Sequence, residues 1–200
     1  SSFLTYGDKD EGVPSAATVS GNAVMKEKKA AVAKALDWLK AHQITTGERK
    51  GAWKAEPQDD VHCSAITGLA LLAFLAHGET VDSEKYGDTV EMAIGYLLGC
   101  QGKDDPAGAF CPLKNQGVYG HAIATYAIGE ATQMMQRRHL KKALEQAIKI
   151  IVKGQQPGGG WDYSYNKGHR RDTSVAVWQI LALEAAYKGD CAASGLLTAI

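Results

Sequence analysis

Residues 154–165 read GQQPGGGWDYSY and place three consecutive glycines directly before a tryptophan. The preceding stretch, AIKIIVKGQ at 147–155, carries apolar side chains at the i, i+1, i+3 and i+4 positions of an amphipathic helix. Glycine lets the chain turn sharply after this helix, so that the aromatic side chain can pack back against the apolar stripe. The sequence therefore predicts a helix that ends in a glutamine, a glycine turn, and a tryptophan folded under the same helix.

The same arrangement occurs three times along the chain. Its glutamines are Gln43, Gln101 and Gln155, which lie 58 and 54 residues apart. Each glutamine ends an amphipathic helix, where its side chain can bond backbone groups that have no partner within the helix. Each is followed by a Gly-x-aromatic group, and these groups are Gly51-Ala52-Trp53, Gly108-Ala109-Phe110 and Gly159-Gly160-Trp161. A period of this length is typical of repeats made of two helices.

A second, more apolar helix is expected after each glycine turn, at 61–78, 118–134 and 172–189. These segments are apolar nearly all round, which indicates that neighbouring helices shield them. The first helix of each repeat carries the charges, as in RRHLKKALEQAIKII at 137–151, and is expected to face solvent. An apolar inner layer beneath a polar outer layer predicts an all-α solenoid or closed ring of helical hairpins.

The domain boundaries follow from the same pattern. Residues 1–22 show no helical period and are rich in Ser, Gly, Thr and Asp, so we expect an extended N-terminal arm or linker there. The repeat domain is expected at 23–200. Its repeats fall at about 24–80, 83–136 and 137–190, and residues 191–200 read as the start of a further repeat.

Composition excludes several classes of function. The 22 basic residues balance 22 acidic ones, so no net field favours nucleic acid or an acidic membrane surface. No apolar run approaches the roughly 20 residues that a membrane-spanning helix needs, and a soluble protein is expected. The four cysteines are too few for a disulfide scaffold. Cys100 and Cys111 flank a loop and could be bridged only in an oxidising compartment.

A Gln followed by Gly-x-Trp after an amphipathic helix resembles the Q-W motif of the prenyltransferase and squalene-oxidase repeat superfamily. The resemblance covers about residues 24–200 and implies an α/α toroid, here a partial ring of about three hairpins plus the start of a fourth. Residues 67–80 (TGLALLAFLAHGET), 119–131 (YGHAIATYAIGEA) and 159–186 are most similar to uncharacterised bacterial squalene-cyclase-like repeat proteins. That likeness implies a protein of the bacterial cytoplasm or cell envelope and leaves the choice between them open.

The resemblance also supplies candidate catalytic residues. Cyclases of this superfamily protonate an alkene with a strong, desolvated acid in Asp-x-Asp-Asp or Asp-Cys-Thr-Ala at the start of an inner helix. Here the corresponding stretch is His62-Cys63-Ser64-Ala65, in which an imidazole stands in the acid's place. Asp60 would have to reach in from the preceding loop, and Asp172-Thr173-Ser174 is the other partial match. The catalytic candidates are therefore Asp60, His62 and Asp172.

Protein prenyltransferases of the same superfamily hold zinc with Asp, Cys and His. Asp60, Cys63 and His121 are the corresponding candidates, since thiolate and imidazole suit zinc. The family's spacing is Asp-x-Cys, whereas this chain has Asp-x-x-Cys. A magnesium-assisted step would need Asp-Asp-x-x-Asp, of which only Asp59 and Asp60 are present. No cofactor is therefore expected, and zinc or magnesium belongs only to an enzyme interpretation. In the structural alternative, His62 bonds locally and Cys63 is buried packing.

Polar and aromatic residues of the inner helices are candidates for a ligand site. Glu130 and Glu184 occupy the same place in the second and third repeats, and buried carboxylates need polar partners. Those partners are either the backbone of a neighbouring hairpin or a ligand. The candidate ligand-binding residues are His121, Tyr119, Tyr126, Glu130, Trp178, Glu184 and Tyr163.

Two functional interpretations remain open. The departures from the family's motifs fall at the catalytic positions, which favours a non-catalytic binding or assembly module. Its inner-helix surface would hold a hydrophobic ligand, a peptide or a protein partner. A partial solenoid leaves an apolar end, so a protein partner or self-association is expected to complete the ring. The alternative is an isoprenoid-processing enzyme, either triterpene cyclase-like or zinc-dependent prenyltransferase-like.

Overall fold

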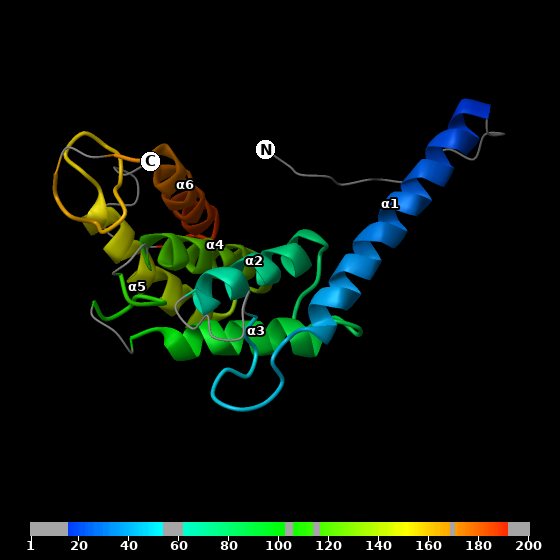
Figure 1. The fold of residues 1–200 in the computed structure, drawn as a ribbon, viewed down its shortest axis with the longest axis horizontal. Helices are drawn as coiled ribbons and strands as arrows, with labels where there is room; N and C mark the ends of the chain where they lie inside the picture. The colour runs from blue at the N-terminus through cyan, green and yellow to red at the C-terminus, as the bar shows by residue number, and fades with distance from the viewer. Residues whose placement is uncertain (1–15, 54–61, 103–105, 114–116, 169–170, 192–200) are drawn as a thin grey trace. The chain divides into compact units, whose positions relative to one another are not determined.

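The computed structural model describes residues 16–53, 62–102, 106–113, 117–168 and 171–191. These residues form α-helices, turns and loops and include no strand, so the protein is all-α as predicted (Figure 1). The chain divides into two compact units, Ser1–Trp38 and Leu39–Ile200. The helix α1 (Ala16–Ala41) begins in the first unit and ends in the second. All other helices belong to the second unit.

The helices of the second unit lie close to the helical segments expected from the sequence. The apolar helices are α2 (Cys63–Ala76), α4 (Gly117–Met135) and α6 (Thr173–Lys188). The charged helices are α3 (Gly87–Cys100) and α5 (Arg138–Gly154).

The start of α1 corrects one boundary. Residues 16–22, which were expected in an extended arm, are helical, and residues 1–15 lie outside the described part of the chain. Ser20 and Gly21 obscured the helical pattern in the sequence, but Ala16, Ala17 and Ala23 in the same stretch have high helix propensity. The further repeat predicted at 191–200 falls almost wholly on residues that the structure does not describe.

The apolar helices pack side by side in chain order, with α4 between α2 and α6. The charged helices cover them on one side: α3 packs on α2, and α5 packs on both α4 and α6. Small residues allow the apolar helices to approach closely. A Cβ added at Gly129 of α4 would lie 2.7 Å from the Cβ of Ala185 on α6, and one at Gly68 would lie 3.2 Å from the backbone of Ala124.

The amphipathic face of α5 illustrates how the two layers are held together. Leu140, Leu144, Ile148 and Ile151 are at most 1% exposed, whereas Lys149 on the other face is exposed. Full burial of such an aliphatic side chain contributes about 1.5–3 kcal/mol. The apolar stripe predicted from the sequence is therefore the surface by which α5 is anchored to the apolar layer.

The first two repeated glutamines tie their glycine turns to the next charged helix. Gln43 Nε2 donates to the carbonyl of Gly51 at 3.0 Å and to that of Thr89, on α3, at 2.9 Å. Gln101 Nε2 donates to Gly108 at 3.0 Å and to Ala143, on α5, at 2.8 Å. Both side chains bond backbone carbonyls outside helices, as expected from the sequence, and each also bonds a carbonyl of the following charged helix. These bonds join each glycine turn to the following repeat.

The indole N–H groups of Trp53 and Trp161 bond the carboxyl ends of helices instead. Trp53 Nε1 donates to the carbonyl of Leu39 and Trp161 Nε1 to that of Ile151, both at 2.8 Å. Both carbonyls lie four residues before the repeated glutamine, in the last turn of a helix, where intrahelical partners run out. The glycine turn is what brings the indole back to this carbonyl.

Candidate functional site

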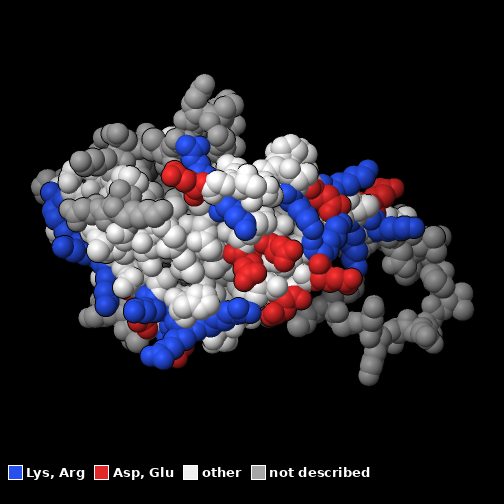
Figure 2. Space-filling view, turned by 90° about the horizontal axis from the view of Figure 1, so that it is seen from below, with Lys and Arg blue, Asp and Glu red and all other residues white. Residues whose placement is uncertain are grey.

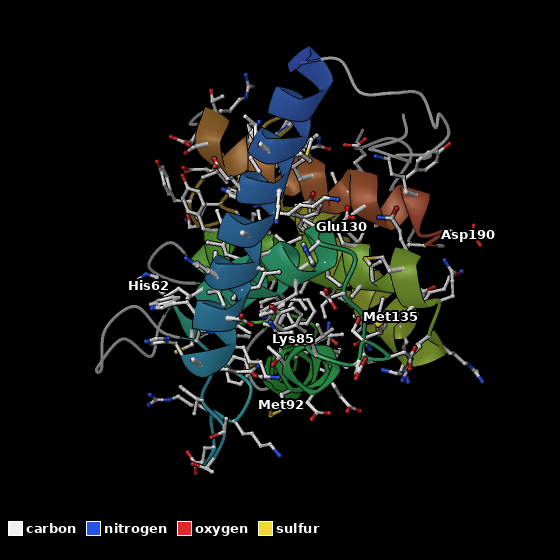
Figure 3. All side chains as sticks on the ribbon, turned by 90° about the vertical axis from the view of Figure 1, so that its right-hand side faces the viewer. His62, Lys85, Met92, Glu130, Met135 and Asp190 are labelled. Atoms are coloured by element: carbon white, nitrogen blue, oxygen red, sulfur yellow. The ribbon has the colours of Figure 1, made fainter. Side chains whose placement is uncertain are left out.

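The three apolar helices share one accessible row of side chains, which we call the open face. Leu69 of α2, Tyr126 of α4 and Ile180 of α6 stand at equivalent repeat positions, 57 and 54 residues apart. Leu69 and Ile180 are each 45% exposed, and Val177 of α6 is 47% exposed. In Figure 3, Glu130 of α4 lies on the side of the layers opposite Met92 of α3. The open face consists of Leu69, Tyr126, Glu130, Val177, Ile180 and Glu184.

Polar groups of the open face gather between α4 and α6. Lys188 Nζ lies 2.7 Å from Glu184 Oε1, and Gln133 Nε2 donates to Glu130 Oε1 at 3.4 Å. Partial burial raises the pKa of Glu130, the positive charge of Lys188 opposes this shift, and Glu184 adds to it. Burial, followed by the charges of the two glutamates, also raises the pKa of Tyr126. Lys188 is thus ion-paired with Glu184, and its charge also acts on the carboxyl group of Glu130 on the neighbouring helix.

This arrangement corrects the expectation that both carboxylates are buried. The side chain of Glu184 is 49% exposed, and Glu130 is half-buried. Their recurrence reflects a shared position on the open face. The pairing with Lys188 needs no backbone of a neighbouring hairpin.

A second cluster lies where α4 and α6 begin, and three of its members were candidates from the sequence. The rings of Tyr119 and Tyr163 pack with centroids 5.8 Å apart. Tyr163 OH donates to Asp172 Oδ2 at 2.8 Å, and Ser174 Oγ donates to Asp172 Oδ1 and is also bonded to Tyr119 OH. Asp172 in addition caps α6, accepting the N–H of Val175 at 3.0 Å. The turn and two helix starts are thereby fastened to one carboxylate.

The electrostatics of this cluster keep Asp172 ionised. The hydrogen bond from Ser174, then those from Val175 N–H and Tyr163, lower its pKa to about 2. The same carboxylate raises the pKa of Tyr163 to about 12 through their hydrogen bond. A general acid needs a raised pKa, so Asp172 has the properties of a helix cap and not of a proton donor.

His121 is placed apart from the open face. It is fully buried; its Nδ1 accepts the N–H of Phe110 at 3.3 Å, and its Nε2 donates to the carbonyl of Ala147 at 3.2 Å. Because Phe110 N–H can only donate, the proton must be on Nε2. Burial lowers the pKa of His121 to about 4. The neutral ring joins the second glycine turn to α5 and offers neither nitrogen to a ligand.

The remaining catalytic and metal candidates are only partly described. His62 is exposed at the start of α2, Cys63 is buried, and Asp60 lies outside the described residues. No group of three or more His, Cys, Asp or Glu side chains within the described ranges is arranged to hold a metal ion. His121 has both nitrogens engaged and so offers no free ligand atom to the candidate zinc set, whose Asp60 lies outside the described residues.

The cysteines and Trp178 complete the comparison with the sequence. The four cysteines are free thiols, and Cys111 Sγ donates to the carbonyl of Gly117 at 3.2 Å, so Cys100 and Cys111 are not bridged. Trp178 is half-buried on α6 beside Val177. Sequence reasoning missed Leu69, Val177 and Ile180. The offsets of 57 and 54 residues that align Leu69 and Ile180 with Tyr126 would have identified two of them.

Comparison of the whole chain with known protein families, characterised proteins and solved structures gives no match. Among the helices that the structure describes, none combines the length and apolar character required to cross a bilayer. The fold and site define a class, an all-α protein whose apolar helix layer has one accessible face. Its function has to be argued from that face.

Proposed function

We propose that the second unit is a non-catalytic binding or assembly module, built as a partial α/α toroid of Q-W repeats. Its open face holds an apolar segment of a protein partner. The observation that carries this proposal is the accessible row formed by Leu69, Val177 and Ile180. Single exposed apolar residues are ordinary, but an aligned row on adjacent helices is characteristic of an interaction surface.

The polar surroundings of this row support a protein partner. Glu130, Glu184 and Lys188 border the apolar side chains, and an apolar centre with a polar rim is typical of protein interfaces. Such a rim orients a partner without supplying chemistry. A hydrophobic small molecule in the same place is the second outcome that an experiment has to distinguish.

The toroid part of the proposal is supported by how one repeat joins the next. A Cβ at Gly51 would lie 2.0 Å from Met92 O on α3, and one at Gly108 would lie 3.1 Å from Gln146 on α5. The third glycine of the series, Gly159, meets no described atom within 4 Å. Among the described residues the third turn is therefore open, which leaves it accessible to a partner that would complete the ring.

The isoprenoid-processing alternative receives less support. A cyclase requires a carboxylic acid that stays protonated, whereas Asp172 is ionised and occupied as a helix cap. His121, the only described histidine of the proposed zinc set, is engaged on both nitrogens. The binding module is therefore the function that the geometry favours.

The test uses Leu69→Ser/Val177→Ser/Ile180→Ser in the full chain, with N-phenyl-1-naphthylamine as a neutral apolar probe. The three side chains are exposed, so we expect the variant to keep its helical content and melting temperature. Probe binding followed by fluorescence, and self-association followed by sedimentation velocity, should both fall. The matched control is Val24→Ser/Met25→Ser/Val32→Ser in α1, whose side chains are 43–47% exposed. Equal effects in both triple variants, or none in the first, would overturn the proposal.

Binding of the neutral probe without any partner-dependent change in sedimentation would assign the face to a small molecule. Native mass spectrometry of the protein from its source then separates the two occupants. A protein bound to the wild-type chain and lost from the open-face variant supports the proposal. A bound lipid in its place overturns the protein partner.

A further inference from the structure

A pocket of about 770 Å³ lies on the side of the molecule that carries α5. One wall is the second glycine turn, another is α5, and the third is the segment that follows α5. Its volume is in the range of small-molecule sites. The residues that matter below are Leu113, Lys149, Ile150, Lys153, Tyr165 and Lys167.

The first repeat has a pocket at the equivalent position, between the first glycine turn and α3, of about 380 Å³. The 54-residue offset relates Ile150 of the larger pocket to Tyr96 of the smaller one. The same offset relates Lys149 and Lys153 to Gly95 and Gly99. The larger pocket is therefore a modified copy of a feature that the repeat produces, and the modification is the pair of lysines.

The apolar part of the larger pocket is formed by side chains that are held in place by packing and hydrogen bonding. The ring of Tyr165 lies so close to Gly154 of α5 that a Cβ there would be 2.4 Å from the ring. Tyr165 has φ of 55°, a conformation that is costly for a bulky residue, and its OH donates to Gln179 Oε1 at 2.7 Å. Burial raises the pKa of this hydroxyl, so Tyr165 is a neutral wall, to which Leu113 and Ile150 add aliphatic surface.

Among the described lining residues of the pocket, the charged side chains are all lysines. Lys149 and Lys153 stand one helical turn apart, where like charges repel unless an anion lies between them. Lys167 Nζ donates to the carbonyls of Lys153 and Gln155, both at 2.5 Å, and so fixes a third positive charge at the end of α5.

No acidic residue is among the described lining of the larger pocket, whereas Glu48 and Glu91 line the smaller one. Figure 2 shows Lys and Arg atoms without acidic atoms beside them at the left-hand edge, the side where α5 ends in Figure 1. An apolar wall beside a pair of lysines suits a molecule that has both an apolar body and a negative group.

We propose that this pocket binds a small amphiphilic anion. Its apolar body lies against Leu113, Ile150 and Tyr165, and its carboxylate, sulfonate or phosphate group lies between the ammonium groups of Lys149 and Lys153. The pocket is separate from the open face, so this assignment does not depend on the proposed function.

The experiment compares two probes that share one ring system. 8-Anilinonaphthalene-1-sulfonate carries a negative group, and N-phenyl-1-naphthylamine is neutral. In Lys149→Gln/Lys153→Gln, we expect the Kd of the sulfonate to rise about tenfold, while that of the neutral probe is unchanged. The matched control is Arg138→Gln/Lys142→Gln, which removes two exposed charges of α5 outside the pocket and should leave both constants unchanged.

Location is tested by backbone amide NMR during titration with the sulfonate. We expect shifts at Gly108, Leu113 and Tyr165, and none at Gly95 and Gly99 of the smaller pocket. The open-face triple variant should retain the lysine-dependent part of sulfonate binding. A failure of the open face and a failure of this pocket are thereby distinguishable.

Three results would overturn the assignment. The control pair could weaken the sulfonate as much as the pocket pair, which would indicate a general charge effect. The pocket pair could change both probes equally, which would indicate an altered fold. Finally, it could lower the melting temperature without changing sulfonate affinity, which would show that the lysines only complement the C-terminal end of α5.

Discussion

In the second repeat, the backbone N–H of Gln101 donates to the carbonyl of Leu97 at 3.2 Å. In the other two repeats, the carbonyl at this position accepts an indole N–H from Trp53 or Trp161. The N–H groups of Gln43 and Gln155 bond the carbonyls of Lys40 and Val152, one residue later along the helix, whereas that of Gln101 is shared between Leu97 and Leu98, each at 3.2 Å. The carbonyl of Leu97 thus has a backbone partner without an indole donor, which fits the presence of Phe110 in place of tryptophan in the second repeat.

The substitution Trp161→Phe tests this account. It removes the donor to the Ile151 carbonyl while keeping most of the buried ring. A buried acceptor left without a partner costs about 1–3 kcal/mol, so the free energy of unfolding should fall by that amount in a urea titration. Trp38→Phe, at a 59% exposed position of α1, should change it by less than about 0.5 kcal/mol. If Trp161→Phe lowers the free energy of unfolding as little as this control does, the indole hydrogen bond does not stabilise the repeat.

Two glycines with nearly the same φ allow the cost of a positive φ to be distinguished from the cost of steric crowding. Gly51 and Gly159 have φ of 96° and 94°, so alanine meets a similar conformational penalty of about 1–2 kcal/mol at either. At Gly51 the added Cβ would also lie 2.0 Å from Met92 O, whereas at Gly159 it meets nothing described within 4 Å. We expect Gly51→Ala to lower the free energy of unfolding by about 1–3 kcal/mol more than Gly159→Ala. Equal decreases in the free energy of unfolding for the two variants, measured by chemical denaturation, would mean that the first turn is not in close contact with α3.

The sequence predicted the helices well because their apolar periods are local. The expected segment 172–189 became Thr173–Lys188, capped by Asp172 as an acidic residue before an apolar run predicts. The bond from Gln101 to Ala143 was out of reach, because it joins residues 42 positions apart through the packing of α5 on the apolar layer. Periodicity assigns helices, and tertiary packing assigns the partners of their side chains.

The candidate site was predicted in part for the same reason. Tyr119, Tyr163 and Asp172 were all candidates, but their mutual bonds depend on the path of the third glycine turn. His121 was misplaced because the sequence does not show that its ring lies beneath α5 and not on the open face. Lys149 and Lys153 were not among the candidate residues, because in the sequence they resemble ordinary solvent-exposed charges of an outer helix. Comparison with Gly95 and Gly99 of the preceding repeat would have revealed them.

The action of Lys188 on Glu130 can be tested by titration. The positive charge of Lys188 holds down a pKa of Glu130 that burial raises. Lys188→Gln should therefore move the pKa of Glu130 further upward, measured by the carboxyl carbon shift in NMR. Lys142→Gln, on the exposed surface of α5, is the control and should leave this carboxyl unmoved. An unchanged pKa of Glu130 in Lys188→Gln would show that the ammonium group of Lys188 interacts only with Glu184.

Stability should depend on pH through His121. Its pKa falls from 6.5 to about 4 on folding because burial disfavours the imidazolium. Between these values the unfolded chain binds more protons than the folded one, so the free energy of unfolding rises with pH across this interval. The contribution is fully present above about pH 6.5 and is lost as the pH falls toward 4. A displacement of this size corresponds to about 3 kcal/mol.

The variant His121→Gln isolates that contribution. Whatever its overall stability, the slope of the free energy of unfolding against pH should decrease between pH 4 and 6.5 relative to the wild type. Asp172 acts in a different interval, because its pKa falls from 3.8 to about 2 and its contribution is lost only at more acidic pH. Asp172→Asn should therefore leave the slope above pH 4 nearly intact. If His121→Gln keeps the wild-type slope, the ring is not held neutral between Phe110 and Ala147, and the joint between the second glycine turn and α5 needs another explanation.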